Sequence, residues 1–369
     1  MSSRNSVGHD ATMRNRAFFI DRTACISCGS AALVELSSGG FADEPLRGIL
    51  ASQTWGESPL PYIAHERWSY VRCSACGQAF HRRILDPQWM TTLYSQWETQ
   101  DAMEAFMAKH ITPQDRLNRG AAFVAHALQL QRMSTSCTGG RALRVLDYGC
   151  GHGEFVAVCR VLGFDAIGID FAPDRDKHGM VHCVTSLNEL RREHERVARF
   201  DVVTLFEVLE HLADPRGTLQ QLAEVMPQGA VLVLETPDAT GVTDLQSATD
   251  YLAIGPLGHI NGFTPTSLRA IAERVGFRAV RPPSAWVTTG NVNRRCPRNG
   301  TRGRCKLDQS TLPGAQLRRP RNRRSLARPR TAVVVVAPAA LHLPSQCACT
   351  LVLRAPRVQG NSVHRRPCQ

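Results

Sequence analysis

Short apolar runs alternate with amphipathic stretches through the middle of the chain. The apolar runs predict strands at Leu143–Tyr148, Ala166–Phe171, Met180–Val184, Asp201–Phe206 and Ala230–Glu235. The stretches between them carry apolar residues at helical spacing and predict helices at Glu154–Leu162, Ser186–Arg199 and Thr218–Val225. A later helix is expected to begin at Thr264 and Pro265 and to end at Gly276. Apolar strands that alternate with helices indicate an α/β fold, a Rossmann-like, mostly parallel sheet with helices on both faces.

The flanks of this segment have different patterns. Residues 20–85 are rich in glycine, proline and turns, with short extended pieces, which is typical of a small metal-stapled module. Residues 86–135 have few helix breakers and predict a helical bridge. We therefore expect a module, a bridge, an α/β domain over 140–288 and a tail over 289–369.

The formal net charge of +12 is confined to the tail. After residue 286 the chain has 17 of its 44 basic residues and one of its 32 acids, Asp308, so the preceding part carries about −4. No basic surface is therefore expected on the folded part, and we do not expect a nucleic-acid partner. Loss of acids with enrichment in Arg, Pro and Cys is typical of a shifted reading frame in GC-rich DNA. We expect the tail to be disordered or frameshifted, with Thr331–Val336 the place where one strand could form.

Membrane and export signals are not evident in the sequence. No run of about 18 apolar residues predicts a membrane span, and the first ten residues lack the apolar core of a secretory leader. These patterns favour a cytoplasmic location. They do not specify an oligomeric state.

A glycine-rich turn follows the first predicted strand, in the order Gly149, Gly151, Gly153. Glycine allows the backbone to approach a ligand at the carboxyl end of a strand. The second strand ends at Asp170, whose carboxylate can accept hydrogen bonds from two ribose hydroxyls. A dinucleotide would fit the same plan, but Glu154 occupies the position of the third glycine of that fingerprint and would repel a pyrophosphate. A cationic sulfonium tolerates this acid, and Asp147 can face the ammonium group of such a ligand.

Val145–Gly153, Asp170 and Phe206–Leu212 together resemble the motifs of class I S-adenosylmethionine-dependent methyltransferases. They are most similar to the small-molecule branch that includes ubiquinone-pathway O-methyltransferases, and the likeness extends from about Arg141 to Phe277. The resemblance implies that S-adenosylmethionine is the cofactor and a small molecule the acceptor, with oxygen the favoured atom. It implies that Gly149, Gly151 and Asp170 contact the cofactor and that Ser186 and Leu187 lie near its adenine. We add Asp147 and Phe206 to these expected cofactor contacts.

The acceptor side is expected after the fourth strand. Methyltransferases that act on exocyclic amines carry [Asn/Asp]-Pro-Pro-[Tyr/Phe] there, whereas this chain has Phe206-Glu207-Val208-Leu209, which argues against base or glutamine methylation. In the ubiquinone-type relatives a matching Glu-x-x-Glu-His stretch is associated with a divalent cation, which here implies Glu207, Glu210 and His211. The alternative is that the two acids favour a helix N-terminus and the histidine packs beside them. Glu207, His211 and His259 are our candidate catalytic residues.

Two C-x-x-C-G pairs, Cys25/Cys28 and Cys73/Cys76, offer the four thiolates of a closed structural zinc site. Forty-four residues separate the pairs, so an insertion must loop out. A redox-active pair is less favoured, because no thioredoxin-like pattern surrounds either one. The pairs resemble N-terminal zinc modules of some bacterial methyltransferases, which sit over the acceptor site.

Two other functions fit parts of the pattern. One is a non-catalytic protein that senses S-adenosylmethionine while the module recruits a partner. The other is an RNA methyltransferase that uses the basic tail to hold phosphates, and its affinity would fall steeply with salt.

Overall fold

The computed structural model describes residues 18–138, 140–171, 180–181, 183–193, 199–280, 331–332 and 349–354. Most of the tail, including Val333–Val336 of the predicted extra strand, lies outside these residues.

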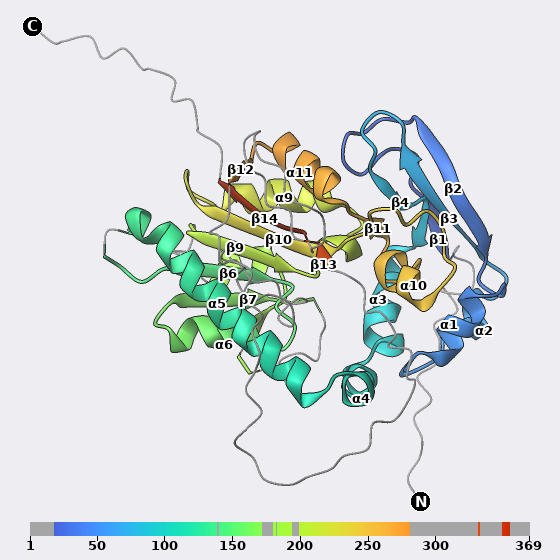
Figure 1. The fold of residues 1–369 in the computed structure, drawn as a ribbon, viewed down its shortest axis with the longest axis horizontal. Helices are drawn as coiled ribbons and strands as arrows, with labels where there is room; N and C mark the ends of the chain where they lie inside the picture. Colours follow the sequence, from blue (N-terminus) through green and yellow to red (C-terminus); the bar gives the residue numbers. More distant parts are fainter. Residues whose placement is uncertain are drawn as a thin grey trace, which may run out of the picture.

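A parallel sheet forms the centre of the larger domain (Figure 1). Five strands run in the order β8 (Cys183–Val184), β7 (Asp165–Ile169), β6 (Arg144–Tyr148), β9 (Val202–Phe206) and β10 (Val231–Pro237), all parallel to their neighbours. Helices α6 (Glu154–Val161), α8 (Leu187–Glu193), α9 (Pro215–Glu224) and α11 (Pro265–Arg274) connect or follow them. Each predicted strand and helix is present, although α9 begins three residues early because Asp214 caps it by accepting from the Gly217 N–H at 2.8 Å.

The two faces of the sheet are covered by different helices because side chains alternate along each strand. Val145 and Val231 point into a cluster with Phe123 and Phe155, from α5 (Pro113–Thr138) and α6. Their neighbours in sequence, Leu146 and Leu232, point to the other face. There they share a core with side chains of α8, α9 and α11, among them Leu219 and Leu268. The apolar runs thus encode a sheet that is buried on both sides (Figure 1).

Two tail segments join this sheet: one begins at Thr331, where a strand was expected to be possible, and the other, at 349–354, differs from the expectation of a disordered tail. β14 (Cys349–Arg354) lies antiparallel between β10 and β12 (Arg278–Val280), and β13 (Thr331–Ala332) pairs with the end of β10. The run Cys-Thr-Leu-Val-Leu-Arg has strand propensity, and the edge of β10 offers it unpaired backbone groups.

The N-terminal module contains its own antiparallel sheet. β2 (Leu33–Gly40), β3 (Arg67–Cys73) and β4 (Ala79–His81) are neighbours in it, and β1 (Phe19–Asp21) pairs with β5 (Arg83–Leu85). The insertion between the cysteine pairs forms β2, α1 (Leu46–Ser52) and α2 (Leu60–Ile63) and returns along β3. The separation of 44 residues is therefore spanned by folded structure.

The predicted bridge is helical throughout most of its length. It consists of α3 (Pro87–Thr92), the π-helical turn η2 (Leu93–Trp97), α4 (Gln100–His110) and α5. Thr99 caps α4 and Asp86 caps α3, each by accepting a backbone N–H. The bridge carries the chain from the module to the outer face of the sheet (Figure 1).

The module and the larger domain share both a sheet and a core. β11 (Asn261–Gly262) from the domain pairs antiparallel with β4 and extends the module's sheet. Aromatic residues of the module pack against the domain segment that contains α10 (Ala248–Ile254), among them Trp68 and Tyr70 against Ile254 and Leu257. The imidazole of His81 donates to the carbonyl of Ile254 at 2.6 Å.

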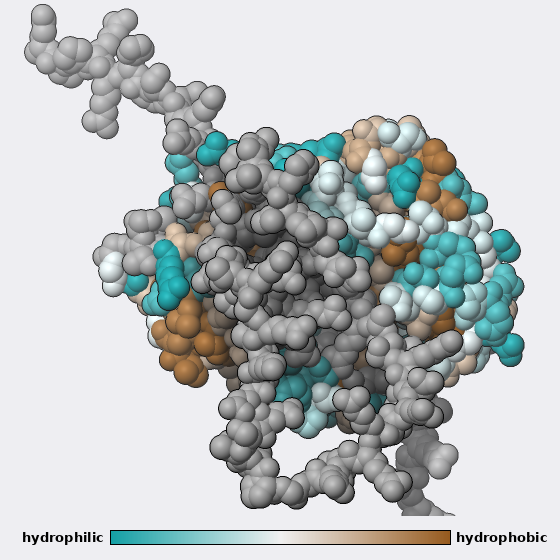
Figure 2. Space-filling model, in the orientation of Figure 1, coloured by the Kyte–Doolittle hydropathy of each residue, from teal (hydrophilic) through white to brown (hydrophobic). Residues whose placement is uncertain are grey.

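The visible surface is mixed in character (Figure 2). The module is mostly hydrophilic in this view, and a hydrophobic patch lies where Figure 1 places α6, on which Val161 is 87% exposed. Among the described residues no helix combines the length and apolar character that a membrane crossing requires.

The interface histidine gives a pH prediction. His81 is fully buried, and burial together with the nearby Arg22 charge lowers its pKa from 6.5 to about 4. Below pH 6.5 the unfolded chain takes up a proton that the folded chain does not, so this part of the stability is lost as pH falls toward 4. The amide of His81→Gln can keep the bond to Ile254. Between pH 7 and 4 we expect the free energy of unfolding of this variant to rise, relative to that of the native chain, by up to about 3 kcal/mol.

Urea unfolding of both proteins across this pH range measures the difference, and acid effects elsewhere cancel. Parallel pH profiles would show that folding does not lower the pKa of His81.

Candidate active site

A cleft of about 620 Å³ opens at the carboxyl ends of β6, β7 and β9. In parallel α/β sheets this edge collects loop residues from several strands and is the usual ligand site. Helices of the bridge cover it, with Met90, Tyr94 and Met103 in its wall. Five carboxylates and one arginine, Arg119, line it among the described residues.

The glycine loop is held close to the end of β7. Gly149 has φ 76°, and its N–H and that of Cys150 both donate to the Ile169 carbonyl at 2.7 and 2.9 Å. A Cβ at Gly149 would lie 2.4 Å from a methyl carbon of Val208, so a side chain there is excluded both by conformation and by space. Gly149 and Gly151, the two glycines expected to contact the cofactor, both line the cleft.

Two predicted acids face the cleft from adjacent strands. Asp170 accepts the Gly151 N–H at 2.8 Å and so ties the loop to the end of β7. Asp147 is 3% exposed and accepts the Thr204 hydroxyl at 2.6 Å. Burial, with a contribution from the charge of Asp170, raises the pKa of Asp147 to about 7. A cationic ligand would favour the ionised form of this pair.

The other predicted cofactor residues are placed differently. Phe206, at the end of β9, lines the cleft and stacks on His126 with ring centroids 5.4 Å apart. Ser186 and Leu187 follow β8 at the same edge of the sheet but are outside the cleft lining. Leu187 is buried in the core, and the Ser186 hydroxyl accepts the Glu189 N–H at 3.1 Å.

Glu207 has an unusual backbone conformation at the floor of the cleft. Its φ of 57° is in the left-handed region, and it is the one described residue other than glycine with positive φ. Such conformations are costly and concentrate at functional sites. Although its side chain opens onto the cleft, reduced solvation inside the protein and the Glu235 carboxylate raise its pKa to about 8.

Glu210, His211 and His259 come together next to Glu207. One ligand atom from each of the three lies within 4.8 Å of the others, and the two imidazoles meet edge to face with centroids 4.7 Å apart. Glu210 is 1% exposed, and neither of its carboxylate oxygens has a hydrogen-bond partner among the described residues. Such a buried carboxylate is costly without a proton or a cation. The resemblance implied that Glu207 joins Glu210 and His211. In the structure the third member of the group is His259 instead.

Both histidines of this trio are held neutral. Burial, then the neighbouring His259, lowers the pKa of His211 to about 3, and burial lowers that of His259 to about 4. The His259 Nδ1–H donates to the Leu252 carbonyl at 2.6 Å, which leaves Nε2 with its lone pair. A carbonyl that accepts from the other ring nitrogen in this way is usual behind a metal-bound imidazole.

Several cleft residues were not predicted from the sequence. Arg119 on α5 pairs with Glu154 at 3.2 Å and lies over the Phe123 ring, while the Gln100 amide contacts His152 of the glycine loop. Tyr94 on η2 approaches His211, with 3.4 Å between its hydroxyl and Nδ1. A π-helical turn often marks a functional site, but local sequence gives no signal for it.

The four cysteines of the module meet at its end near the domain. The sulfurs of Cys25 and Cys76 are 3.6 Å apart, as are those of Cys28 and Cys73, and all four are within 4.8 Å of one another. Tetrahedral zinc with bonds of about 2.3 Å would need sulfurs roughly 3.8 Å apart. The residues therefore fit a four-thiolate metal. The Ser27 N–H also points at the Cys25 sulfur at 3.4 Å.

Residues 116–281 match a family model described as a methyltransferase domain. The ubiquinone biosynthesis O-methyltransferase of Leptothrix cholodnii is 33% identical over 104 residues, which are 26% of this chain and 44% of that protein. The protein of the same name from Psychrobacter arcticus is 34% identical over 150 residues, 36% of this chain and 58% of its own length.

A solved structure of a SAM-dependent methyltransferase from Archaeoglobus fulgidus is 28% identical with a TM-score of 0.32. The match covers 42% of this chain and 68% of that one. The chain spans about half the length of the curated relatives that it matches. The family match and these relatives indicate an enzyme.

Proposed function

We propose that the protein transfers a methyl group from S-adenosylmethionine to a small-molecule acceptor, with oxygen the favoured atom. The observation that carries this proposal is the loop at Gly149–Gly151, tied to Asp170 and opening into the cleft of a methyltransferase domain. Asp170 would accept the ribose hydroxyls, and Asp147 would face the ammonium group. Phe206 would pack against the cofactor.

The reaction needs positioning more than activation, because the sulfonium is already a good leaving group. An acceptor oxygen attacks the methyl carbon in line, the bond from that carbon to sulfur breaks, and the acceptor's proton passes to a base. The Glu207 carboxylate would take that proton, because its raised pKa of about 8 makes it the stronger base, whereas His211 and His259 would face the acceptor as neutral imidazoles. Glu207 lies beside them on the floor of the cleft.

The charge of the cleft favours a small acceptor over RNA. Histidines aside, five of its six acidic or basic lining residues are acids, and the one cation, Arg119, already pairs with Glu154, so the lining offers a phosphate backbone little to bind. An intact loop and a proton acceptor beside it likewise favour turnover over cofactor sensing alone.

The cofactor assignment predicts the effect of a single charge. We expect Asp170→Asn to weaken binding of S-adenosylmethionine about ten- to a hundredfold, because hydrogen bonds to a charged group contribute about 1.5–3 kcal/mol. Isothermal titration calorimetry measures this. Asp165→Asn is the matched control, since Asp165 lies at the opposite end of the same strand and is exposed. Equal affinities for both variants would contradict the assignment.

We further propose that Glu210, His211 and His259 hold a divalent cation that would orient an acceptor oxygen and lower its pKa. The ligand types suit a borderline or hard cation, and the unpartnered Glu210 carboxylate supports it. At 100 times its Kd, Mn²⁺ should stabilise the native chain by about 2.7 kcal/mol. Glu210→Gln should abolish this shift in thermal unfolding.

Glu207→Gln is the control for the choice of ligands. It should keep the Mn²⁺ shift, because Glu207 is outside the trio. Loss of the shift in Glu207→Gln and its retention in Glu210→Gln would reverse the assignment.

We propose that the four cysteines of the module hold one structural zinc. Elemental analysis should find one zinc per native chain, and Cys73→Ser should lose it together with much of the module's stability, because three ligands leave the tetrahedron open. Cys159→Ser is the control, since that buried thiol on α6 is remote from the cluster and its loss should leave zinc unchanged. Native protein without zinc, prepared without chelator, would disprove the site.

A further inference from the structure

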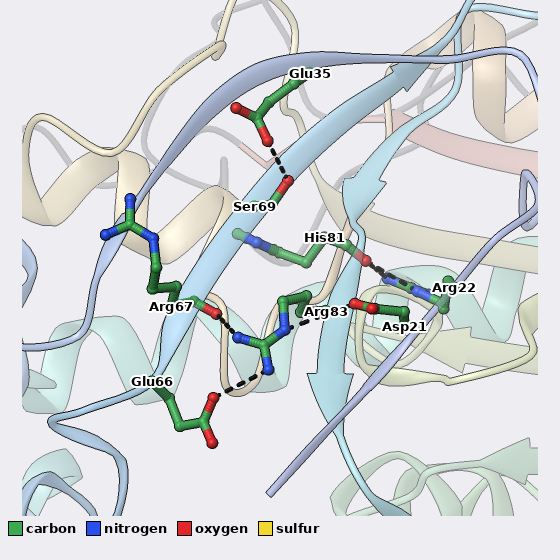
Figure 3. Close-up of polar contacts among 8 residues, drawn as sticks. All are labelled: Asp21, Arg22, Glu35, Glu66, Arg67, Ser69, His81 and Arg83. Atoms are coloured by element: carbon green, nitrogen blue, oxygen red, sulfur yellow. Dashed lines mark hydrogen bonds and ion pairs between the residues drawn. The ribbon is translucent and has the colours of Figure 1, made fainter. Parts of the chain in front are cut away.

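A buried polar connection begins at Arg22, which follows β1 in the module. Its guanidinium donates through Nε and Nη2 to the His81 carbonyl at 2.9 and 2.6 Å and through Nη2 to the Ile260 carbonyl at 2.8 Å. Nη1 donates to Oδ1 of Asn261 at 2.8 Å. Figure 3 shows the Arg22 side chain reaching the backbone at His81, across the strand from Arg83. One side chain of the module thus binds three groups, two of which belong to the domain.

Asn261 continues the connection into the acceptor side of the cleft. It is 1% exposed, and its Nδ2 donates to the carbonyls of Leu209 at 3.0 Å and Leu212 at 2.8 Å. Leu209 begins the 3₁₀ turn η3 (Leu209–His211), and its carbonyl also accepts the Leu212 N–H, whereas the Leu212 carbonyl follows the turn and is a helix-end group that needs an outside donor.

The Arg22 contact determines which way this amide points. With Oδ1 facing the guanidinium, both N–H groups of Nδ2 face the turn. A flipped amide would place its oxygen against two carbonyls and its NH₂ against a cation. Arg22 and the two carbonyls of the turn therefore favour the same orientation of Asn261, and Arg22 fixes the end of the amide that faces the module.

We propose that Arg22 is a positioning residue for the acceptor side of the cleft. It acts through Asn261 to hold the turn at residues 209–212, and so sets the places of Glu210 and His211. This inference rests on the proposed function, which assigns those residues to the acceptor. The planar guanidinium spans three acceptors at fixed angles, which a lysine ammonium cannot do.

Arg22→Lys and Arg83→Lys form a matched pair of variants. Arg83 lies in the same module and donates to the Arg67 carbonyl at 2.8 Å and to Glu66 at 3.0 Å, within the module (Figure 3). Both substitutions keep the charge and remove hydrogen bonds. Of these two arginines, Arg22 is the one joined to the turn through Asn261.

Hydrogen–deuterium exchange of the full chain provides the readout. In Arg22→Lys, the peptide over residues 206–214 should exchange at least about tenfold faster, since the amides of His211 and Leu212 bond within the turn that loses support. The peptide over the glycine loop at 145–153 and the zinc content should match the native chain. Arg83→Lys should leave the 206–214 peptide unchanged.

Asn261→Asp tests the second step and serves if Arg22→Lys does not fold. The carboxylate keeps an acceptor for Arg22 but has no N–H for the turn, so fast exchange at 206–214 is again expected. The inference would be overturned if the 206–214 peptide exchanged at the native rate in both Arg22→Lys and Asn261→Asp. It would also be overturned if Arg83→Lys accelerated exchange of this peptide as much as Arg22→Lys does. Calorimetry with S-adenosylhomocysteine separates the inference about Arg22 from the proposed function. If the native chain does not bind this ligand, the proposed function is refuted, whereas the exchange experiment still tests the link from Arg22 to the turn.

Discussion

The tight passage of the backbone from β6 into α6 is the constraint on which the site depends. Gly149 and Cys150 both donate to the Ile169 carbonyl, and Gly151 donates to Asp170, so the loop can lie in one place against the end of β7. Val208 occupies the space where a side chain of Gly149 would be. The glycine loop therefore packs directly on the segment that leads from Glu207 into the η3 turn. The proposed cofactor side and the proposed acceptor side of the cleft meet at this contact.

The acceptor side is supported from two directions. From the domain, Glu207 leaves β9 in a left-handed conformation and its N–H donates to the Glu235 carbonyl at 2.8 Å, which turns the chain out of the sheet. From the module, β4 pairs with β11, and Asn261 caps the turn. The module is thus part of the cleft's construction.

Local patterns were sufficient to predict the elements and the cofactor loop. Apolar runs, the Thr264–Pro265 start signal and the spacing of Gly149, Gly151 and Asp170 depend on neighbours in sequence, and each predicted element is present. Long-range placement was not accessible in this way. His259 joins Glu210 and His211 because β11 pairs with the module, and Leu187 turns into the core because α8 packs on the sheet. Arg22 gives no motif at all, since its partners are 59 and 239 residues away. The strand at Cys349–Arg354 was missed because composition masked a short run of strand formers.

Under the proposed function, the cleft selects an aminoacyl sulfonium nucleoside and rejects a dinucleotide. Glu154 in the first turn of α6 and the acids around the loop are compatible with the first ligand and repel the pyrophosphate of the second. Parallel calorimetric titrations of the full native chain with S-adenosylhomocysteine and with NAD test this most directly. The account predicts binding of S-adenosylhomocysteine with a Kd in the micromolar range, roughly 1 μM to 1 mM, and no binding of NAD. Binding of NAD without binding of S-adenosylhomocysteine would contradict it.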